Sequence, residues 1–192
     1  LLASLIESAD KVANTASVYG AFLKHIKKSA SQKLVLQSAD FIENDNSHKV
    51  YKEDSNELIK KIEGDILYLD PPYNQRQYSA NYHLLNTIAL YDNFEPKGKT
   101  GLREYNRSKY SQKNEVSKSF EELIKNANFK YIFLSYNNEG LMSEDEVKNI
   151  MKKYGIYDLQ KKEYSRFKAD KTENRNHKAN STFEYLYILE KK

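Results

Sequence analysis

The residues best suited to chemistry are four consecutive ones, Asp70, Pro71, Pro72 and Tyr73. They follow the short apolar run 66–69, which predicts a strand that ends at Asp70. Proline fixes φ and has no backbone N–H, so two prolines in a row hold a rigid, extended turn with free carbonyl groups. The Asp70 carboxylate and the Pro71 carbonyl could then accept two hydrogen bonds from one exocyclic amine, while Tyr73 offers a stacking face. These residues suit an amino group on a flat ring, such as N6 of adenine.

Methyl transfer is a reaction that this turn would support. The lone pair of adenine N6 is delocalised into the ring, so the nitrogen is a poor nucleophile. Hydrogen bonds to Asp70 and the Pro71 carbonyl would favour a pyramidal nitrogen, whose lone pair points at an electrophilic methyl group. An adenine stacked inside a duplex is out of reach, so it would have to flip out onto Tyr73. The simpler alternative is a structural Pro-Pro turn after a strand.

The composition excludes several other kinds of site. The chain has 192 residues, enough for about one domain with a real core, and it has no cysteine, so a thiolate nucleophile is impossible. Its four histidines are scattered without metal-ligand spacing, so we expect no metal site. No apolar run approaches membrane-spanning length, and no secretory leader is visible. Because the lack of cysteine also suits a reducing compartment, we expect a cytoplasmic protein with no membrane partner.

Basic residues gather in two stretches of the chain. Residues 97–118 carry seven Lys or Arg against two Glu, a net charge of +5, and residues 161–178 carry seven against three acidic residues, a net charge of +4. Both stretches contain Tyr or Phe. Basic loops with aromatic residues suit a nucleic-acid backbone and its bases, so we expect loops 93–117 and 168–180 to face nucleic acid. Two solvated loops would explain the same composition equally well.

Apolar periodicity predicts alternating helices and strands. The expected helices cover about residues 1–13, 19–30, 55–62, 81–91, 120–127 and 144–154, and the expected strands cover 34–36, 50–51, 65–70, 131–134, 157–167 and 182–190. Gly155 is expected to cap the last helix. The order predicts an α/β fold with a mostly parallel, Rossmann-like sheet and a C-terminal antiparallel hairpin at or next to one edge. Because ligands bind at the carboxyl ends of parallel strands, Asp70 and the polar run 135–138 should share one cleft.

Asp54 is a second candidate carboxylate. It follows the expected strand 50–51, where its side chain could accept a hydrogen bond from the adenine amine of a cofactor. It also suits the N-cap of helix 55–62, because a carboxylate at that position accepts from the first backbone N–H groups of a helix. The two roles are compatible.

Several motifs together give the chain a family resemblance. It resembles the second part of an N6-adenine DNA methyltransferase, of the class in which a glycine-rich cofactor loop precedes the Asp-Pro-Pro-Tyr motif, as in restriction–modification systems. The resemblance runs through residues 16–21, 70–78, 81–83, 98–103, 135–140, 164–168 and 184–186. It therefore covers nearly the whole chain. Asp in the first motif position favours adenine N6 over cytosine N4, for which the related pattern usually has Ser.

The resemblance implies a set of ligands and a role for each candidate residue. The methyl donor would be S-adenosyl-L-methionine, the substrate double-stranded DNA methylated at a specific site, and a restriction endonuclease of the same site a further partner. The catalytic residues would be Asp70, Pro71, Pro72 and Tyr73, with Asp70 as the carboxylate that binds N6. Asp54 and Asp70 would contact the cofactor. The DNA-contacting side chains would be Arg76, Tyr78, Tyr82, Arg103, Arg166 and Lys168.

One part of the family pattern is missing from the chain. None of the six glycines forms the Phe-x-Gly-x-Gly cofactor loop, which the resemblance places before residue 1. We therefore expect residues 1–192 to be the C-terminal part of a single methyltransferase domain, with a helical segment at 1–47 and a catalytic α/β half at 48–192. The missing N-terminal half would be a partner required for activity. The loss of its central strands would expose apolar edges.

Two other functions stay open at the level of the sequence. A methyltransferase remnant without its cofactor half would bind nucleic acid in a salt-sensitive way and transfer no methyl group. An N6-adenine methyltransferase acting on RNA would use the same cleft.

Overall fold

The computed structural model of the chain describes residues 1–16, 18–20, 23–165 and 181–192. The chain divides into two units: the first consists of residues 1–48 and 76–107, and the second of residues 49–75 and 108–192. Asp70 to Tyr73 belong to the second unit, which also contains the sheet.

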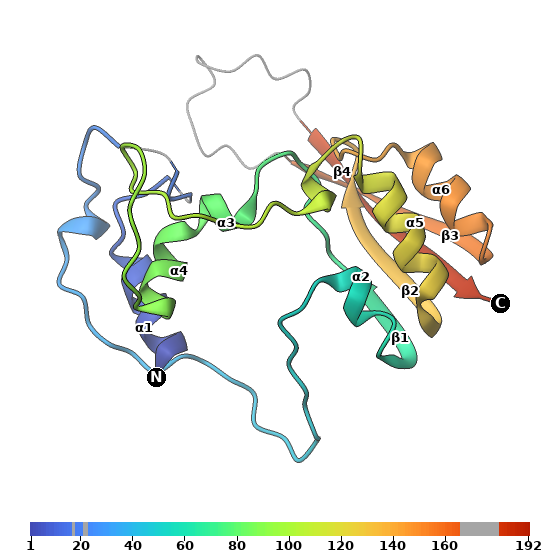
Figure 1. Cartoon of the computed structure of the whole chain (residues 1–192), viewed down its shortest axis with the longest axis horizontal. Coiled ribbons are helices and arrows are strands. Elements are labelled where there is room, and N and C mark those ends of the chain that lie inside the picture. The colour runs from blue at the N-terminus through green and yellow to red at the C-terminus, as the bar shows by residue number, and fades with distance from the viewer. Residues whose placement is uncertain (17, 21–22, 166–180) are drawn as a thin grey trace. The chain divides into compact units, whose positions relative to one another are not determined.

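The second unit is built on a four-stranded sheet with the strand order β1-β2-β4-β3 (Figure 1). Its strands are β1 (Glu63–Leu69), β2 (Asn128–Asn137), β3 (Gly155–Ser165) and β4 (Ser181–Lys191). β1 and β2 are parallel, and β4 runs antiparallel to both β2 and β3, so three of the four strands share one direction. This confirms the predicted α/β fold, in which the C-terminal hairpin inserts its second strand next to the edge.

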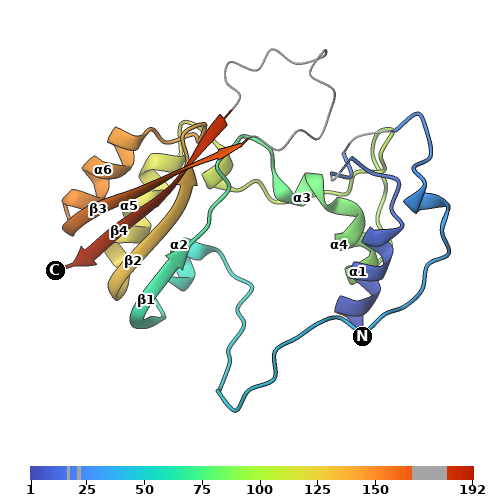
Figure 2. The same cartoon turned by 180° about the vertical axis from the view of Figure 1, so that it is seen from behind.

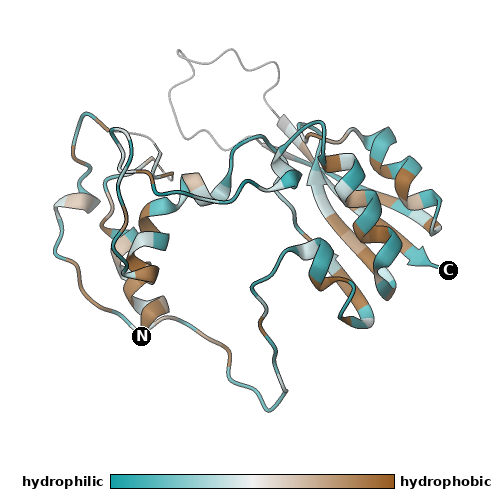
Figure 3. Cartoon of the chain, viewed as in Figure 1, coloured by the Kyte–Doolittle hydropathy of each residue, from teal (hydrophilic) through white to brown (hydrophobic). Residues whose placement is uncertain are grey.

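One face of the sheet is packed against helices α5 (Val116–Asn126) and α6 (Glu144–Lys152). Apolar residues gather on the strands and on the sheet-facing sides of these helices (Figure 3). The fully buried side chains from the strands are Ile132, Leu134, Tyr136, Tyr187 and Leu189, and those from the helices include Phe120, Ile124, Val147 and Met151. Burial of this many large side chains is the main stabilising term of the unit.

The opposite face of the sheet is bare of helices in the described part of the chain. Figure 2 shows β3 and β4 from this side with no helix over them, among the residues that the structure describes. On β1, Ile66 and Tyr68 are 63% and 61% exposed, although isoleucine is among the residue types most often buried. Within the described part of the chain, β1 also has a partner strand on one side only. The sheet therefore ends in an open edge with apolar side chains beside it.

The ends of α5 and α6 are held by specific contacts. The Lys191 ammonium donates to the carbonyl groups of Ile124, Lys125 and Ala127 at the carboxyl end of α5. These are groups that a helix cannot satisfy by itself. α6 begins with a capping box, in which the backbone N–H groups of Glu146 and Ser143 each donate to the other residue's side chain.

The prediction that Gly155 caps α6 is wrong. The C-cap is Lys153 in the right-handed region, and Gly155 is already the first residue of β3. A Cβ at position 155 would overlap the backbone carbonyl of Glu190 on β4. Glycine is needed there because two backbones approach closely, not because a helix ends.

The first unit contains α1 (Leu2–Lys11), a 3₁₀ turn at Ser29–Ser31, α3 (Tyr78–Asn81) and α4 (His83–Leu90). α1 packs against α4. Tyr19 connects α1 with α3, because its hydroxyl donates to Asp10 Oδ1 at 2.5 Å and its backbone N–H donates to the Asn81 carbonyl at 2.7 Å.

Three predicted elements between residues 19 and 51 are wrong in the described part of the chain; residues 21 and 22 of the expected helix 19–30 lie outside it. Of the expected helix 19–30, only the 3₁₀ turn at Ser29–Ser31 forms. The Asn14 side chain binds the backbone of His25 and Lys27 instead, which competes with helical hydrogen bonding. The expected strands 34–36 and 50–51 do not form, and Val50 is 95% exposed. An isolated short apolar run is not stable as a strand without a neighbour to pair with.

The remaining elements form with shifted boundaries. The helix expected at 55–62 is α2, a single turn at Ser55–Leu58. The helix expected at 81–91 begins earlier and is divided at Tyr82 into α3 and α4. No helix of the described residues is long and apolar enough to cross a membrane.

Candidate active site

The Asp-Pro-Pro-Tyr turn leaves the sheet at the carboxyl end of β1. The last paired residues are Leu69 on β1 and Leu134 on β2, so Asp70 emerges beside the last residues of β2, which ends at Asn137. The backbone N–H of Leu141, in the loop that follows β2, donates to the Tyr73 carbonyl at 2.9 Å. The two strand ends therefore lie side by side. Ser135 lines a different pocket from the one that Asp70 lines, so the predicted shared cleft stays a prediction.

A pocket of about 290 Å³ lies beside this turn. Asp70, Pro71 and Pro72 form one wall, and Phe120 and Leu123 of α5 form another. The remaining lining residues are Ser55 of α2, Tyr68 and Leu69 of β1, and Ser108 and Tyr110 around the 3₁₀ turn Lys109–Ser111. The pocket thus combines flat apolar surfaces with one carboxylate and the hydroxyl groups of two serines and two tyrosines, which is typical of a site for a small ligand with a planar ring.

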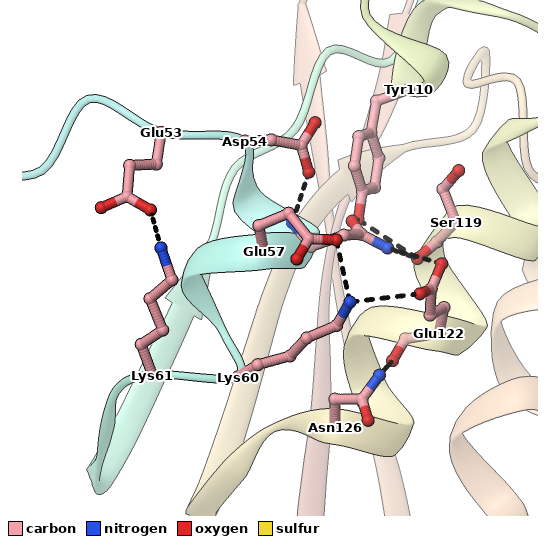
Figure 4. A network of polar contacts seen from close by, with 10 residues as sticks. Glu53, Asp54, Glu57, Lys60, Lys61, Tyr110, Ser119, Glu122 and Asn126 are labelled. Atoms are coloured by element: carbon pink, nitrogen blue, oxygen red, sulfur yellow. Dashed lines mark hydrogen bonds and ion pairs between the residues drawn. The ribbon is translucent and has the colours of Figure 1, made fainter.

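A network of polar contacts holds the α2 side of the pocket (Figure 4). The hydroxyl of Tyr110 donates to Asn56 Oδ1 at 2.8 Å, and Asn56 Nδ2 donates to the Ser119 carbonyl on α5 at 2.9 Å. Lys60 bridges Glu57 at 2.8 Å and Glu122 at 3.8 Å. Burial raises the pKa of Tyr110 above its ordinary value, so the phenol stays neutral. The network fixes the Tyr110 ring in the pocket wall and ties α2 to α5.

Asp54 is the N-cap of α2, as one of its two predicted roles requires. Its Oδ1 accepts from the backbone N–H of Asn56 at 2.9 Å. Asp54 itself does not line the pocket, but the next residue, Ser55, does. The predicted contact between Asp54 and a cofactor stays a prediction.

Tyr73 meets a second ring at the end of β2. The rings of Tyr73 and Tyr136 are edge to face, with centroids 6.5 Å apart and planes at 88°. Tyr136 is buried and Tyr73 is 38% exposed. The alternating pattern of β2 predicts a buried Tyr136, but nothing in the sequence indicates that its ring supports Tyr73.

Glu184 is a site residue that the sequence did not identify. It lies on β4 opposite Asn137, at the same end of the sheet as Asp70. Burial, and then the negative charge of Asp70, raise the pKa of Glu184 above its ordinary value. Asp70 therefore has a second carboxylate in its neighbourhood.

We expect Glu184→Gln to raise the melting temperature of the full-length protein at pH 7. Because the folded-state pKa of Glu184 is raised, its charged form is disfavoured in the folded state, and this penalty is present above the folded-state pKa. It vanishes below the ordinary value of 4.5, where the folded and unfolded states are both protonated. The difference between variant and wild type should therefore shrink as the pH falls, as followed by calorimetry. A difference that grows toward low pH would contradict this account.

The predicted DNA-contacting residues are distributed unevenly. Tyr78 and Tyr82 lie together in the first unit, with ring centroids 6.0 Å apart, and Arg76 lies two residues before Tyr78. Arg103 is in the same unit, but its side chain is only 11% exposed. Its guanidinium binds Asp92 at 2.7 Å and lies 4.6 Å from the Phe94 ring centroid. This geometry gives Arg103 a structural role, and its contact with DNA stays a prediction.

Arg166, Lys168 and the loop 168–180 lie outside the described residues. Within the described ranges, no group of three or more His, Asp or Glu side chains is arranged to hold a metal ion.

The combination of an α/β sheet, an Asp-Pro-Pro-Tyr turn at a strand end and a flat-walled pocket beside it is that of an amino-group methyltransferase. Residues 1–150 match the family described as D12 class N6 adenine-specific DNA methyltransferase. The chain belongs to this family.

Relatives of the chain carry names that agree with this family. It is 70% identical to the type II methyltransferase M.NlaIII of Neisseria lactamica, over 100% of this chain and 57% of that protein. It is 47% identical to the type II methyltransferase M.FokI of Planomicrobium okeanokoites, over 100% of this chain and 30% of that protein. It is 39% identical to the type II methyltransferase M.CviAII of Paramecium bursaria Chlorella virus 1, over 98% of this chain and 56% of that protein. The chain thus spans between about a third and somewhat over half of these relatives. No solved structure matches it.

Proposed function

We propose that the full-length protein containing this chain is a site-specific DNA methyltransferase, which transfers a methyl group from S-adenosyl-L-methionine to N6 of a flipped adenine. The observation that carries the proposal is the position of Asp70. It stands at the end of β1, in a rigid Pro-Pro turn, and borders a pocket with flat apolar walls. Membership of the D12 class family supports adenine N6 as the acceptor.

The pocket fits the adenosyl part of S-adenosyl-L-methionine in its chemistry. Tyr110 and Phe120 supply aromatic surface, Pro72 supplies a flat aliphatic one, and Ser55 and Asp70 supply polar groups at the rim. An adenine ring needs flat apolar contact on its faces and hydrogen-bonding groups at its edge. When bound, S-adenosyl-L-methionine supplies an electrophilic methyl group.

The residues of the turn would act on the acceptor amine. The Asp70 carboxylate and the Pro71 carbonyl accept hydrogen bonds from the N6 amino group and so orient the lone pair of nitrogen. Asp70 also stabilises the positive charge that develops on nitrogen as the new bond forms, and it accepts a proton from N6 afterwards. Tyr73 stacks on the flipped base, as an exposed aromatic ring next to the carboxylate allows.

The same proposal includes partners beyond this chain. The bare sheet face and the open edge of β1 support a further part of the same enzyme that packs there, as the relatives' greater length allows. Double-stranded DNA is the proposed substrate, in the cytoplasm. A restriction endonuclease that cuts the same site is a further proposed partner, since the relatives are named type II methyltransferases.

The direct test measures methyl transfer by the full-length protein. Duplex DNA and RNA of the same sequence are incubated with methyl-labelled S-adenosyl-L-methionine, and the nucleosides are separated by mass spectrometry. We expect N6-methyladenine in the duplex DNA alone. N4-methylcytosine in the products would mean that cytosine, not adenine, is the acceptor base. Methylation of the RNA would mean that the substrate is not restricted to duplex DNA. Salt-sensitive DNA binding with no methyl transfer would show a non-catalytic remnant.

A further inference from the structure

The end of β2 and the loop 138–142 that follows it hold the Asp-Pro-Pro-Tyr turn in two ways. The backbone N–H of Leu141 donates to the Tyr73 carbonyl at 2.9 Å, which fixes the backbone of the last residue of the turn. The Tyr136 ring, near the end of β2, meets the Tyr73 ring at 88°, which is a favoured geometry for two aromatic rings. Together these contacts restrain the position of the Tyr73 backbone and the orientation of its ring.

The loop itself is fixed at several points. The buried Tyr136 hydroxyl accepts from the Met142 backbone N–H at 3.2 Å, which closes the loop on itself. Asn138 exchanges two hydrogen bonds with Phe183 on β4, at 3.1 Å through its backbone N–H and at 3.0 Å through its Oδ1. The Lys113 ammonium donates to the Leu141 carbonyl at 2.5 Å. The support under Tyr73 is therefore tied to β4 and to the segment before α5.

Gly140 determines where the Tyr136 ring can lie. A Cβ at position 140 would overlap that ring, at 2.6 Å from Cζ and 2.7 Å from Cδ1. The backbone at Gly140 is not in the left-handed region, which only Gly98 and Gly101 occupy among the described glycines. Alanine is thus compatible with the backbone, and the only obstacle to it is the ring. An added methyl group would displace Tyr136 from its contact with Tyr73.

We propose that Tyr136 and Gly140 are positioning residues, which hold the Tyr73 ring in the position and orientation that stacking on a flipped adenine requires. The inference rests on the proposed function and assigns to that site a support outside the Asp-Pro-Pro-Tyr turn. Neither residue touches the reacting atoms. They act through Tyr73.

The test uses the full-length enzyme and a duplex with 2-aminopurine at the target position, which is first located by mapping N6-methyladenine in DNA modified by the wild type. The fluorescence of 2-aminopurine rises when the base leaves the stack and falls when it stacks on a ring. For Gly140→Ala we expect kcat to fall about 10- to 100-fold, because a displacement of about 1 Å has effects of this size. KM for S-adenosyl-L-methionine should stay unchanged. The fluorescence of the complex should move to the value given by Tyr73→Ala.

Gly64→Ala is the matched control. It also adds a methyl group against an aromatic ring of the same unit, at 3.1 Å from Phe129 Cε1, but at the amino end of β1. We expect a shift in melting temperature with wild-type kcat and wild-type fluorescence. If Gly140→Ala does not fold, Tyr136→Phe takes its place, since it keeps the ring and removes only the acceptor for the Met142 N–H. The 2-aminopurine fluorescence of the Tyr136→Phe complex should also move toward the value given by Tyr73→Ala.

The double variant Tyr73→Ala/Gly140→Ala separates positioning from general damage. Since Gly140 acts through Tyr73, the double variant should be no slower than Tyr73→Ala alone. Losses that multiply, or a Gly140→Ala fluorescence equal to the wild type, would overturn the inference while the proposed function stands. A wild-type enzyme that makes no N6-methyladenine would overturn the proposed function, and the inference with it.

Discussion

Replacing Asp70 with Ala in the full-length enzyme is expected to lower N6-adenine methylation at least 100- to 1,000-fold, roughly the loss seen when one group that stabilises transition-state charge is removed. The Asp70 carboxylate stands at the end of β1 and borders the pocket, where no second carboxylate of the lining can replace it. DNA affinity should change little, because contacts between basic side chains and phosphate dominate it, and a carboxylate does not supply such contacts. Transfer of a labelled methyl group and fluorescence anisotropy of labelled DNA measure the two quantities.

Asp65→Ala is the control for this substitution. Asp65 is an exposed carboxylate on the same strand, near its opposite end, so its loss removes the same charge without touching the turn. It should leave both methylation and DNA binding near wild type. Asp70→Asn adds a finer comparison, since it keeps the size of the side chain and removes its charge. Near-normal turnover in Asp70→Ala would eliminate the proposed mechanism.

The centre of the candidate site could be predicted because its residues are local in the sequence. Asp70 to Tyr73 follow directly on a strand whose apolar run is unmistakable, and the N-cap position of Asp54 depends only on the next two residues. The walls of the pocket could not be predicted in this way. Tyr110 reaches Asn56 across 54 positions of the chain, and no local pattern encodes such a pairing. The support of Tyr73 by Tyr136 was missed for the same reason.

The same contrast separates the parts of the fold that were predicted from those that were not. Strands β2, β3 and β4 pair with one another inside the described chain, so their apolar patterns lead to the expected sheet. The runs 34–36 and 50–51 have strand-like composition but no neighbour to pair with in the described residues. Charge patterns alone also do not predict which basic side chains are available to bind DNA. Arg103 lies in a basic stretch, but its guanidinium forms an ion pair with Asp92 inside the same unit.

Ile66→Lys should leave the stability of the 192-residue chain alone nearly unchanged but lower that of the full-length enzyme. In the chain, Ile66 is 63% exposed on the bare sheet face, so lysine should change the free energy of unfolding by less than about 0.5 kcal/mol. If a further part of the enzyme covers this face, the same lysine becomes an unpaired buried charge. That should cost about 3–5 kcal/mol of stability and weaken the binding of S-adenosyl-L-methionine, whose proposed pocket begins on the same strand. Thermal unfolding and calorimetric titration of both proteins measure these effects.

Ile156→Lys is the matched control, because Ile156 is 61% exposed and lies in the same row of the sheet as Ile66, on the far edge strand β3. Its effect in the full-length enzyme should be smaller, since β3 lies at the opposite edge from β1. Wild-type stability of Ile66→Lys in the full-length enzyme would mean that this face stays open there. Tight binding of S-adenosyl-L-methionine by the 192-residue chain alone would mean that the pocket beside Asp70 needs no further part of the enzyme. Weak binding by the chain and tight binding by the full-length protein would instead tie the donor site to the part that covers β1.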